Sequence, residues 1–171
     1  MKRLLFVGRL TRIKGLDVLL SALDGLKDQE WELDVVGDGP QRAEFETLSE
    51  HLGLSDRVRF HGFQDDPQDW MVESDLLVFP SLDEGMGLVL LQSAQVGLPV
   101  IASDLDAARE IGAKQDQLIP PGDIRAWRWV WRKILEREYT PKPLNPSIAF
   151  SIKEVAEKAL VFYHNTLSTS I

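Results

Sequence analysis

The chain has 171 residues, of which 44% are hydrophobic, 27% charged and 8% aromatic. This composition is close to that of an average globular protein, so a disordered or fibrous chain is excluded, and the length fits one domain better than two. Lysine and arginine number 19 against 27 acidic residues, and the net charge of −8 would repel a nucleic acid backbone. Because cysteine is absent, disulfides, thiolate metal sites and thiol catalysis are excluded.

The apolar runs are too short for a membrane span. The longest, residues 76–80 and 97–102, fall well below the roughly 20 residues that a helix needs to cross a bilayer. Arg9, Arg12 and Lys14 interrupt the N-terminal stretch before the apolar core of a signal peptide could form. We therefore expect a soluble, cytoplasmic protein.

Strand and helix patterns alternate along the chain. The predicted strands cover residues 4–7, 31–36, 58–60, 75–79, 98–102 and 117–119. The predicted helices cover residues 14–26, 40–52, 65–73, 87–96, 106–112 and 123–137. Leucines spaced three and four residues apart support the first helix, and Pro40 suits the first turn of the second. This alternation predicts an α/β fold, a doubly wound, Rossmann-like parallel sheet with helices on both faces.

The C-terminal part of the chain has a different composition. Prolines gather in residues 140–146, and Ser151 and Glu154 have the spacing of a helix-capping box. We therefore expect a domain over residues 1–138, a proline-rich linker over 139–150 and a terminal helix over 151–171.

In a doubly wound sheet, ligands bind at the carboxyl ends of the strands, and the first of these ends carries cations. Arg9 follows the first predicted strand, and Lys14 stands at the start of the helix that comes next. Two cations beside a helix N-terminus suit a diphosphate, although both side chains could instead be solvated surface charges. The chain has neither the Gly-x4-Gly-Lys-Ser/Thr loop nor the Gly-x-Gly-x-x-Gly turn, which disfavours a P-loop enzyme or a dehydrogenase.

The segment 81–92 carries a second set of polar and small residues. Glu84 precedes Gly85 and Gly87, which open a helix, and Gln92 lies about two turns further along it. Free amides at this helix N-terminus could hold a phosphate or sugar hydroxyls, and Glu84 could accept hydrogen bonds from a sugar. On these residues alone, a capped core helix is about as good a reading as a ligand site.

Several motifs together resemble a known family. In chain order they are Val7-Gly8-Arg9-Leu10, Val36-Gly37-Asp38-Gly39-Pro40, Val58-Arg59-Phe60-His61-Gly62, Glu84-Gly85-Met86-Gly87-Leu88, Gly97-Leu98-Pro99-Val100-Ile101-Ala102-Ser103-Asp104 and Pro120-Pro121-Gly122-Asp123. This order and spacing resemble the C-terminal, donor-binding half of GT-B retaining glycosyltransferases of family 4, the glycosyl transferases group 1. The resemblance covers about residues 4–135, and residues 150–156 resemble the terminal helix that crosses back to the N-terminal domain in these enzymes.

The resemblance implies roles for individual residues. Arg9 and Lys14 would bind the diphosphate of a nucleoside-diphosphate sugar, and Glu84 would bind the sugar, so these three are the candidate catalytic residues. The rest of the implied donor site consists of Gly8, Gly62, Phe63, Ser81, Gly85, Met86, Gly87, Leu88 and Gln92. The implied reaction is transfer of a hexose with retention of configuration, in polysaccharide biosynthesis, without a metal or another cofactor.

The chain departs from the family pattern in three places. Gln92 replaces the carboxylate expected to bind the ribose, and Asp106-Ala107-Ala108 replaces a small Gly-Gly pair. The N-terminal acceptor domain has no counterpart in the chain, so we expect nucleotide binding without turnover. A non-catalytic nucleotide-sugar-binding or regulatory module therefore remains an alternative, and an epimerase of GT-B architecture is a third with no supporting feature.

Other candidate sites are weaker. Asp104 and Asp106 have the Asp-x-Asp spacing of metal-dependent transferases, and the histidines are expected in surface or packing roles. In residues 125–137, tryptophans alternate with basic side chains; one face should be core, while Trp129 falls among the cations. Trp129 is therefore a candidate for contact with the missing domain or with the inner face of an anionic membrane.

Overall fold

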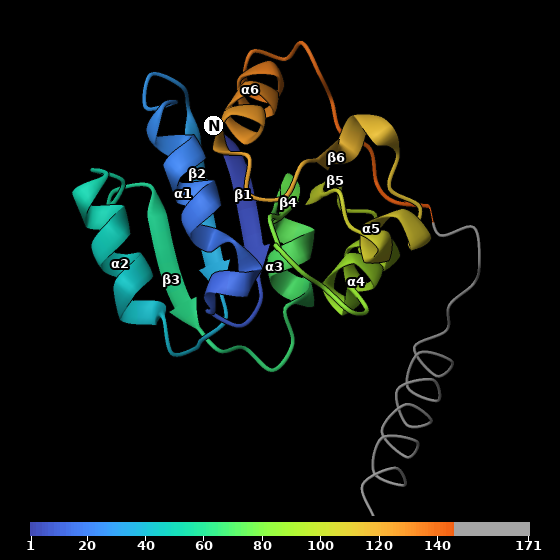
Figure 1. The fold of residues 1–171 in the computed structure, drawn as a ribbon, viewed down its shortest axis with the longest axis horizontal. Helices are drawn as coiled ribbons and strands as arrows, with labels where there is room; N and C mark the ends of the chain where they lie inside the picture. The colour runs from blue at the N-terminus through green and yellow to red at the C-terminus, as the bar shows by residue number, and fades with distance from the viewer. Residues whose placement is uncertain (146–171) are drawn as a thin grey trace, which may run out of the picture.

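The computed structural model describes residues 1–145, which form one sheet of six parallel strands (Figure 1). The strands are β1 (Lys2–Val7), β2 (Trp31–Val36), β3 (Val58–Gly62), β4 (Leu76–Phe79), β5 (Val100–Ser103) and β6 (Leu118–Ile119). Their order in the sheet is β3-β2-β1-β4-β5-β6, so the winding direction reverses between β1 and β4. This order confirms the predicted doubly wound α/β fold and puts a ligand crevice at the carboxyl ends of β1 and β4.

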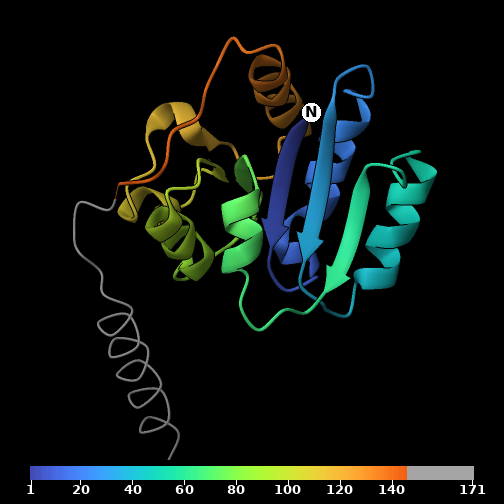
Figure 2. The same cartoon turned by 180° about the vertical axis from the view of Figure 1, so that it is seen from behind.

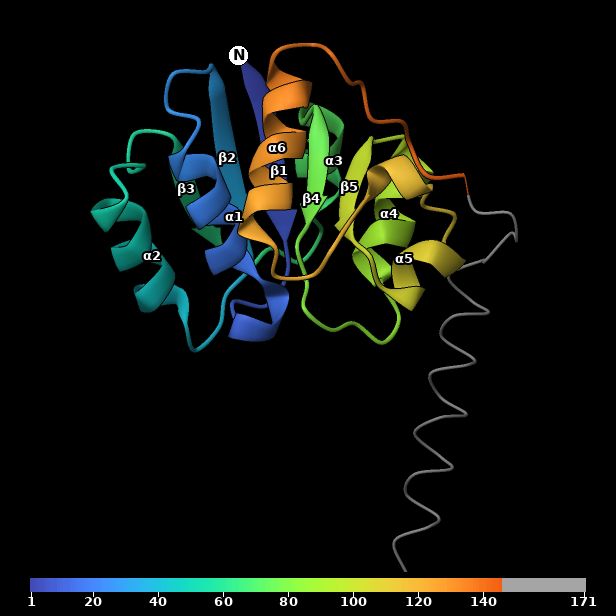
Figure 3. The same ribbon diagram turned by 45° about the horizontal axis from the view of Figure 1, so that its top comes forward.

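Helices cover the two faces of the sheet in groups (Figures 1 and 3). One face carries α1 (Leu16–Asp24), α2 (Arg42–His51) and α6 (Ile124–Leu135). The other face carries α3 (Gln68–Glu73), α4 (Leu88–Val96) and α5 (Asp106–Glu110). Two short 3-10 turns, η1 (Arg12–Lys14) and η2 (Gln115–Gln117), precede α1 and β6. None of the helices in residues 1–145 is both long and apolar enough to cross a membrane.

Strands β1, β4 and β5 bury side chains on both faces, as their apolar runs predict, whereas β2 and β3 carry charged residues such as Asp34 and Arg59 on one face. In β1, Leu4 and Phe6 pack in the cluster beneath α1 and α6, whereas Leu5 packs in the cluster beneath α3 and α4. This alternation follows from the two-residue period of a strand. The core on the α1 side is the larger and contains Trp127 and Trp131, both fully buried.

Helix α6 lies against α1, and its arginines bind carbonyls at the C-terminal end of α1. Arg128 donates from Nη2 to the carbonyl of Ser21 at 2.8 Å and from Nε to that of Ala22 at 3.3 Å, and Arg132 reaches the carbonyl of Gly25 at 3.4 Å. Helix α1 has no basic residue in its own last turn. The arginines of α6 therefore satisfy the carbonyls that remain free at the end of α1 and oppose the negative end of its dipole.

Most predicted boundaries differ from the structure by one to three residues, and two of these differences have a clear local reason. The predicted helix over residues 14–26 begins only at Leu16, because Gly15 has a φ of 67° and separates η1 from α1. Strand β4 begins at Leu76, since the Asp75 carboxylate accepts a hydrogen bond from the backbone N–H of Arg3 at 2.8 Å.

The proline-rich stretch lies against the sheet over its described part. Pro143 bridges to Pro99, the carbonyl of Lys142 accepts a hydrogen bond from the side chain of Gln117 at 2.7 Å, and Leu144 is buried. The predicted terminal helix over residues 151–171 lies outside the described residues, so the proposed division of the chain stays a prediction.

Gly15 holds the loop after β1 against the loop after β4. Its backbone is in the left-handed region, and a Cβ there would overlap the carbonyl of Pro80. Gly97 has a similar φ of 71° but faces open space. Substituting Gly97 therefore tests the effect of backbone strain alone, and substituting Gly15 tests strain together with the close contact to Pro80.

We expect Gly15→Ala to lower the free energy of unfolding by about 3 kcal/mol and Gly97→Ala by only about 1 kcal/mol, the usual strain of a left-handed residue that is not glycine. Urea denaturation followed by tryptophan fluorescence measures both. Equal losses in the two variants would contradict the close approach between Gly15 and Pro80.

Candidate functional site

Loops from four strands meet at the carboxyl edge of the sheet, below the arrowheads in Figure 1. Backbone hydrogen bonds join these loops: the N–H of Leu10 donates to Asp38 at 2.9 Å, that of Gly37 to Gly62 at 2.8 Å, and that of Leu82 to Ile13 at 2.8 Å. The loops after β1, β2, β3 and β4 therefore form one connected rim, which keeps the side chains on it in fixed relative positions.

A cavity of about 380 Å³ opens on this rim. It is lined by Val7, Gly8, Arg9, Val36, Gly37, Asp38, Phe63 and Gln64. Three predicted site residues, Gly8, Arg9 and Phe63, are thus brought together, and Gly62 is buried next to them with a φ of 73°. Gln64 is a lining residue that the motifs did not indicate; its position two residues after a strand-ending glycine was the available signal.

Lys14 and Glu84 form an ion pair on the same rim. Lys14 Nζ donates to Glu84 Oε2 at 2.6 Å, and the two side chains are 24% and 16% exposed. The pair joins the loop after β1 to the loop before α4, as expected for loops that meet at one edge of a parallel sheet. Lys14, Glu84 and Gln92 do not line the cavity that contains Arg9, so the predicted cations occupy adjacent parts of the rim.

Several groups act on the Glu84 carboxyl. Burial by itself raises its pKa, but the hydrogen bond and the charge of Lys14, with the backbone N–H groups of Met86 and Gly87, lower the pKa below its ordinary value. Glu84 is therefore ionised at neutral pH. It can accept hydrogen bonds from hydroxyl groups with the added strength of a charged acceptor.

The N-terminus of α4 is open beside this pair. Gly87 caps the helix in the left-handed conformation with a φ of 65°, and a Cβ on Gly85 would meet nothing within 4 Å. Met86 and Leu88 are exposed, Ser81 is buried and Gln92 is half-buried. The first amides of α4, together with Glu84, can thus approach a polar ligand closely.

The weaker candidates do not line the cavity. Asp104 accepts two hydrogen bonds from Arg109, at 2.8 and 2.7 Å, and Asp106 lies 3.7 Å from the same guanidinium. Within residues 1–145, no group of three or more acidic or histidine side chains is placed to hold a metal ion. Trp129 is 63% exposed, and Lys133 Nζ lies 5.8 Å from its ring centre.

The fold and the site define a Rossmann-like α/β domain with a ligand crevice where the strand order reverses. The chain belongs to the glycosyl transferases group 1, the family whose pattern matches residues 1–137. Its sheet and helices are those of a GT-B glycosyltransferase domain. The predicted resemblance is confirmed for the family and for the fold.

Individual relatives agree with this assignment. The O-antigen biosynthesis glycosyltransferase WclY of Escherichia coli is 34% identical over 116 residues, which are 68% of this chain and 31% of WclY. The phosphatidyl-myo-inositol mannosyltransferase of Mycobacterium leprae is 35% identical over 133 residues, covering 73% of this chain and 35% of that protein. The chain thus spans about a third of the length of these relatives.

Solved structures show the same fold. The lipopolysaccharide outer core galactosyltransferase WaaB, in its apo form, superposes with a TM-score of 0.73 at 27% identity, over 80% of this chain and 41% of WaaB. HepE of Anabaena, solved in complex with UDP, superposes with a TM-score of 0.70 at 25% identity, over 81% of this chain and 40% of HepE.

The ion pair between Lys14 and Glu84 predicts how stability depends on pH. Because the pKa of Glu84 is lower in the folded protein, its contribution is complete above the unfolded pKa and is lost as the pH falls through the folded pKa. We expect Glu84→Gln to lower the free energy of unfolding by about 1 kcal/mol near neutral pH and by progressively less below about pH 4.

Urea denaturation at several pH values measures this difference. The matched control is Glu44→Gln, which removes the partner of the exposed Arg12 and should change stability by less than about 0.5 kcal/mol. A Glu84→Gln deficit that persists in acid would show that the carboxylate charge is not its origin.

Proposed function

We propose that this chain is the donor-substrate half of a glycosyltransferase that transfers a hexose from a nucleoside-diphosphate sugar with retention of configuration. The observation that carries the proposal is the Lys14–Glu84 pair at the open N-terminus of α4, next to the cavity that contains Arg9. A cation, a carboxylate and free amides on one rim match the charge pattern of a sugar diphosphate. The family membership and the UDP bound to HepE support the same substrate class.

In the proposed mechanism, Arg9 and Lys14 act on the leaving group. Cleavage of the bond between sugar and diphosphate leaves negative charge on the nucleoside diphosphate. Cations held by the fold stabilise this charge more in the transition state than in the ground state, which is where binding accelerates a reaction. Because these side chains supply the positive charge, the proposed reaction requires no metal ion.

Glu84 and the glycines around it would orient the sugar. An ionised carboxylate accepts hydrogen bonds from sugar hydroxyls, and Gly85 leaves room for the ring to approach the backbone. The nucleobase would enter the cavity beside Phe63, which is 71% exposed and offers a flat apolar surface. We further propose that transfer needs an acceptor-binding half, on the same or on another polypeptide.

A second candidate function has support from Gln92. The neutral amide of this half-buried side chain on α4 replaces the carboxylate that the family pattern places at the ribose. A neutral hydrogen bond is about half as strong as a charge-assisted one, so donor binding would be weaker. A nucleotide-sugar-binding or regulatory module without catalysis fits this change.

Peripheral membrane contact through Trp129 belongs to the same proposal. An exposed tryptophan beside Lys133 suits an anionic bilayer surface. Flotation of the protein with liposomes should therefore increase with anionic lipid, and flotation insensitive to that lipid would argue against the contact.

Titration calorimetry tests the proposed diphosphate site. We expect at least one of UDP, GDP and ADP to bind, and Arg9→Ala and Lys14→Ala each to weaken binding by about tenfold, the loss of a charge-assisted contact. Arg12→Ala is the matched control, because Arg12 lies on the same loop but pairs with Glu44 and is 71% exposed. Absence of heat with all three nucleotides at millimolar concentration would overturn the proposal.

Two experiments bear on the second candidate function, and the first uses the variant Gln92→Glu. If Gln92 occupies the ribose subsite, restoring the carboxylate should tighten nucleoside diphosphate binding by about fivefold and leave inorganic pyrophosphate unaffected. Transfer by the wild-type chain when an acceptor-binding half is supplied would exclude the non-catalytic module. An unchanged nucleotide affinity in Gln92→Glu would remove Gln92 from the ribose subsite.

A further inference from the structure

His61 is the extra residue of a β-bulge at the carboxyl end of β3. In the pairing of β2 with β3, Val35 lies opposite Phe60 and the next residue, Val36, lies opposite Gly62, so His61 has no partner. A bulge rotates the side chains that follow it and often stands next to a functional site. Here Gly62 turns back with a φ of 73°, and the chain then delivers Phe63 and Gln64 to the cavity.

Three contacts fix His61, two to its ring and one to its carbonyl. Ring Nε2 lies 2.6 Å from Oδ1 of Asp34 on β2, and the ring centre lies 4.1 Å from that of Trp70 on α3. The carbonyl accepts a hydrogen bond from the Gln64 side chain at 3.3 Å. Since an ionised carboxylate only accepts hydrogen bonds, His61 donates through Nε2.

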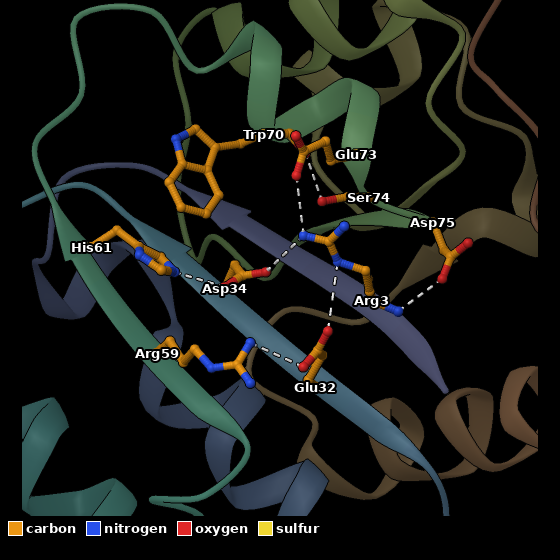
Figure 4. A network of polar contacts seen from close by, with 9 residues as sticks. All are labelled: Arg3, Glu32, Asp34, Arg59, His61, Trp70, Glu73, Ser74 and Asp75. Atoms are coloured by element: carbon orange, nitrogen blue, oxygen red, sulfur yellow. Dashed lines mark hydrogen bonds and ion pairs between the residues drawn. The ribbon is translucent and has the colours of Figure 1, made fainter.

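Asp34 is an unusual anchor because it is a buried carboxylate in the middle of a sheet. Its side chain is 3% exposed, Arg3 Nη2 lies 3.9 Å from Oδ2, and that oxygen has no hydrogen-bond partner among the described residues. Figure 4 shows His61 and Arg3 approaching this carboxylate from opposite sides. The contact with His61 is the one short hydrogen bond that the described side chains give this carboxylate. Because a buried acid without a partner destabilises the folded protein, loss of His61 would leave Asp34 in an unfavourable state.

Asp34 and His61 lie on the face of the sheet that carries α3, and no described helix covers β2 and β3 on this face, as Figure 2 shows. On this face, therefore, no described helix packs over the bulge in the way that α3 and α4 pack over β4, although Phe60 on the opposite face packs against the larger core. Only the edge of α3, through Trp70, reaches it. The contacts of His61 with Asp34 and Trp70 therefore replace helix packing on this face, and the backbone hydrogen bond from Gly37 to Gly62 holds the end of the bulge.

We propose that His61 is a positioning residue that fixes the nucleobase side of the cavity: clamped between Asp34 and Trp70, it holds the bulge that presents Phe63 and Gln64. This inference rests on the proposed function. It assigns binding of the base to the His61 bulge and binding of the diphosphate to Arg9 and Lys14, which both stand on the loop after β1. A preorganised loop binds its ligand with less loss of conformational freedom, so releasing the bulge weakens the base contact alone.

Calorimetric titration of the full chain with a nucleoside diphosphate and with inorganic pyrophosphate separates the two parts. For the tightest-binding of UDP, GDP and ADP, we expect His61→Leu to weaken binding by about tenfold, while pyrophosphate affinity changes by less than about twofold. His61→Gln, which keeps an N–H for Asp34, should recover most of the nucleotide affinity. The matched control is Arg59→Gln, because Arg59 lies on the same strand and pairs with Glu32 but lies before the bulge.

The double variant Asp34→Leu with His61→Leu controls for stability. Replacing both partners by apolar side chains removes the unpaired buried carboxylate. The double variant should therefore unfold at a higher urea concentration than His61→Leu. A nucleotide defect that persists in this more stable variant supports positioning, and a defect that disappears with the recovered stability overturns it.

The remaining outcomes separate this inference from the proposed function. Wild-type protein that binds neither nucleotide nor pyrophosphate overturns both. Wild-type binding of the nucleotide with equal affinity in His61→Leu overturns the inference alone, as does an equal loss of nucleotide and pyrophosphate affinity in that variant.

Discussion

The arrangement of the site depends on how closely the loop after β1 approaches the backbones on either side of it. Gly37 lies against the carbonyl of Gly8, and Gly15 lies against that of Pro80, at positions where a Cβ would overlap backbone atoms. Glycine alone allows this approach with a positive φ. Because the loop is held at both ends, Arg9 lines the cavity and Lys14 reaches Glu84.

The two halves of the site differ in charge and in polarity. At the Lys14 end, a charged pair and the free amides of α4 create a polar surface that suits phosphate and sugar. At the cavity end, Val7, Val36 and Phe63 provide apolar walls, and Arg9 and Asp38 stand at the rim. The proposed ligand, with a flat base at one end and a charged sugar diphosphate at the other, matches this division.

Much of the fold could be predicted because most strands contain a short apolar run that is followed by glycine, proline or a polar residue. The break at Gly15 could not, since the leucine period indicates where a helix packs and says little about its first turn. The rim residues Arg9, Lys14 and Glu84 were accessible through strand ends and motif spacing. The contact of His61 with Asp34 was not, because it depends on the register between β2 and β3 and on a bulge that no local pattern marks.

The closure of α1 by α6 affects the order in which the chain can fold as it is synthesised. The arginines that cap the carbonyls of α1 lie more than a hundred residues further along the sequence. When the first strands leave the ribosome, α1 therefore has an exposed apolar face and uncapped carbonyls. Pairing of β1 with β2 can begin early, but the native hydrogen-exchange protection of α1 must await synthesis of α6, so the domain gains its cooperativity late.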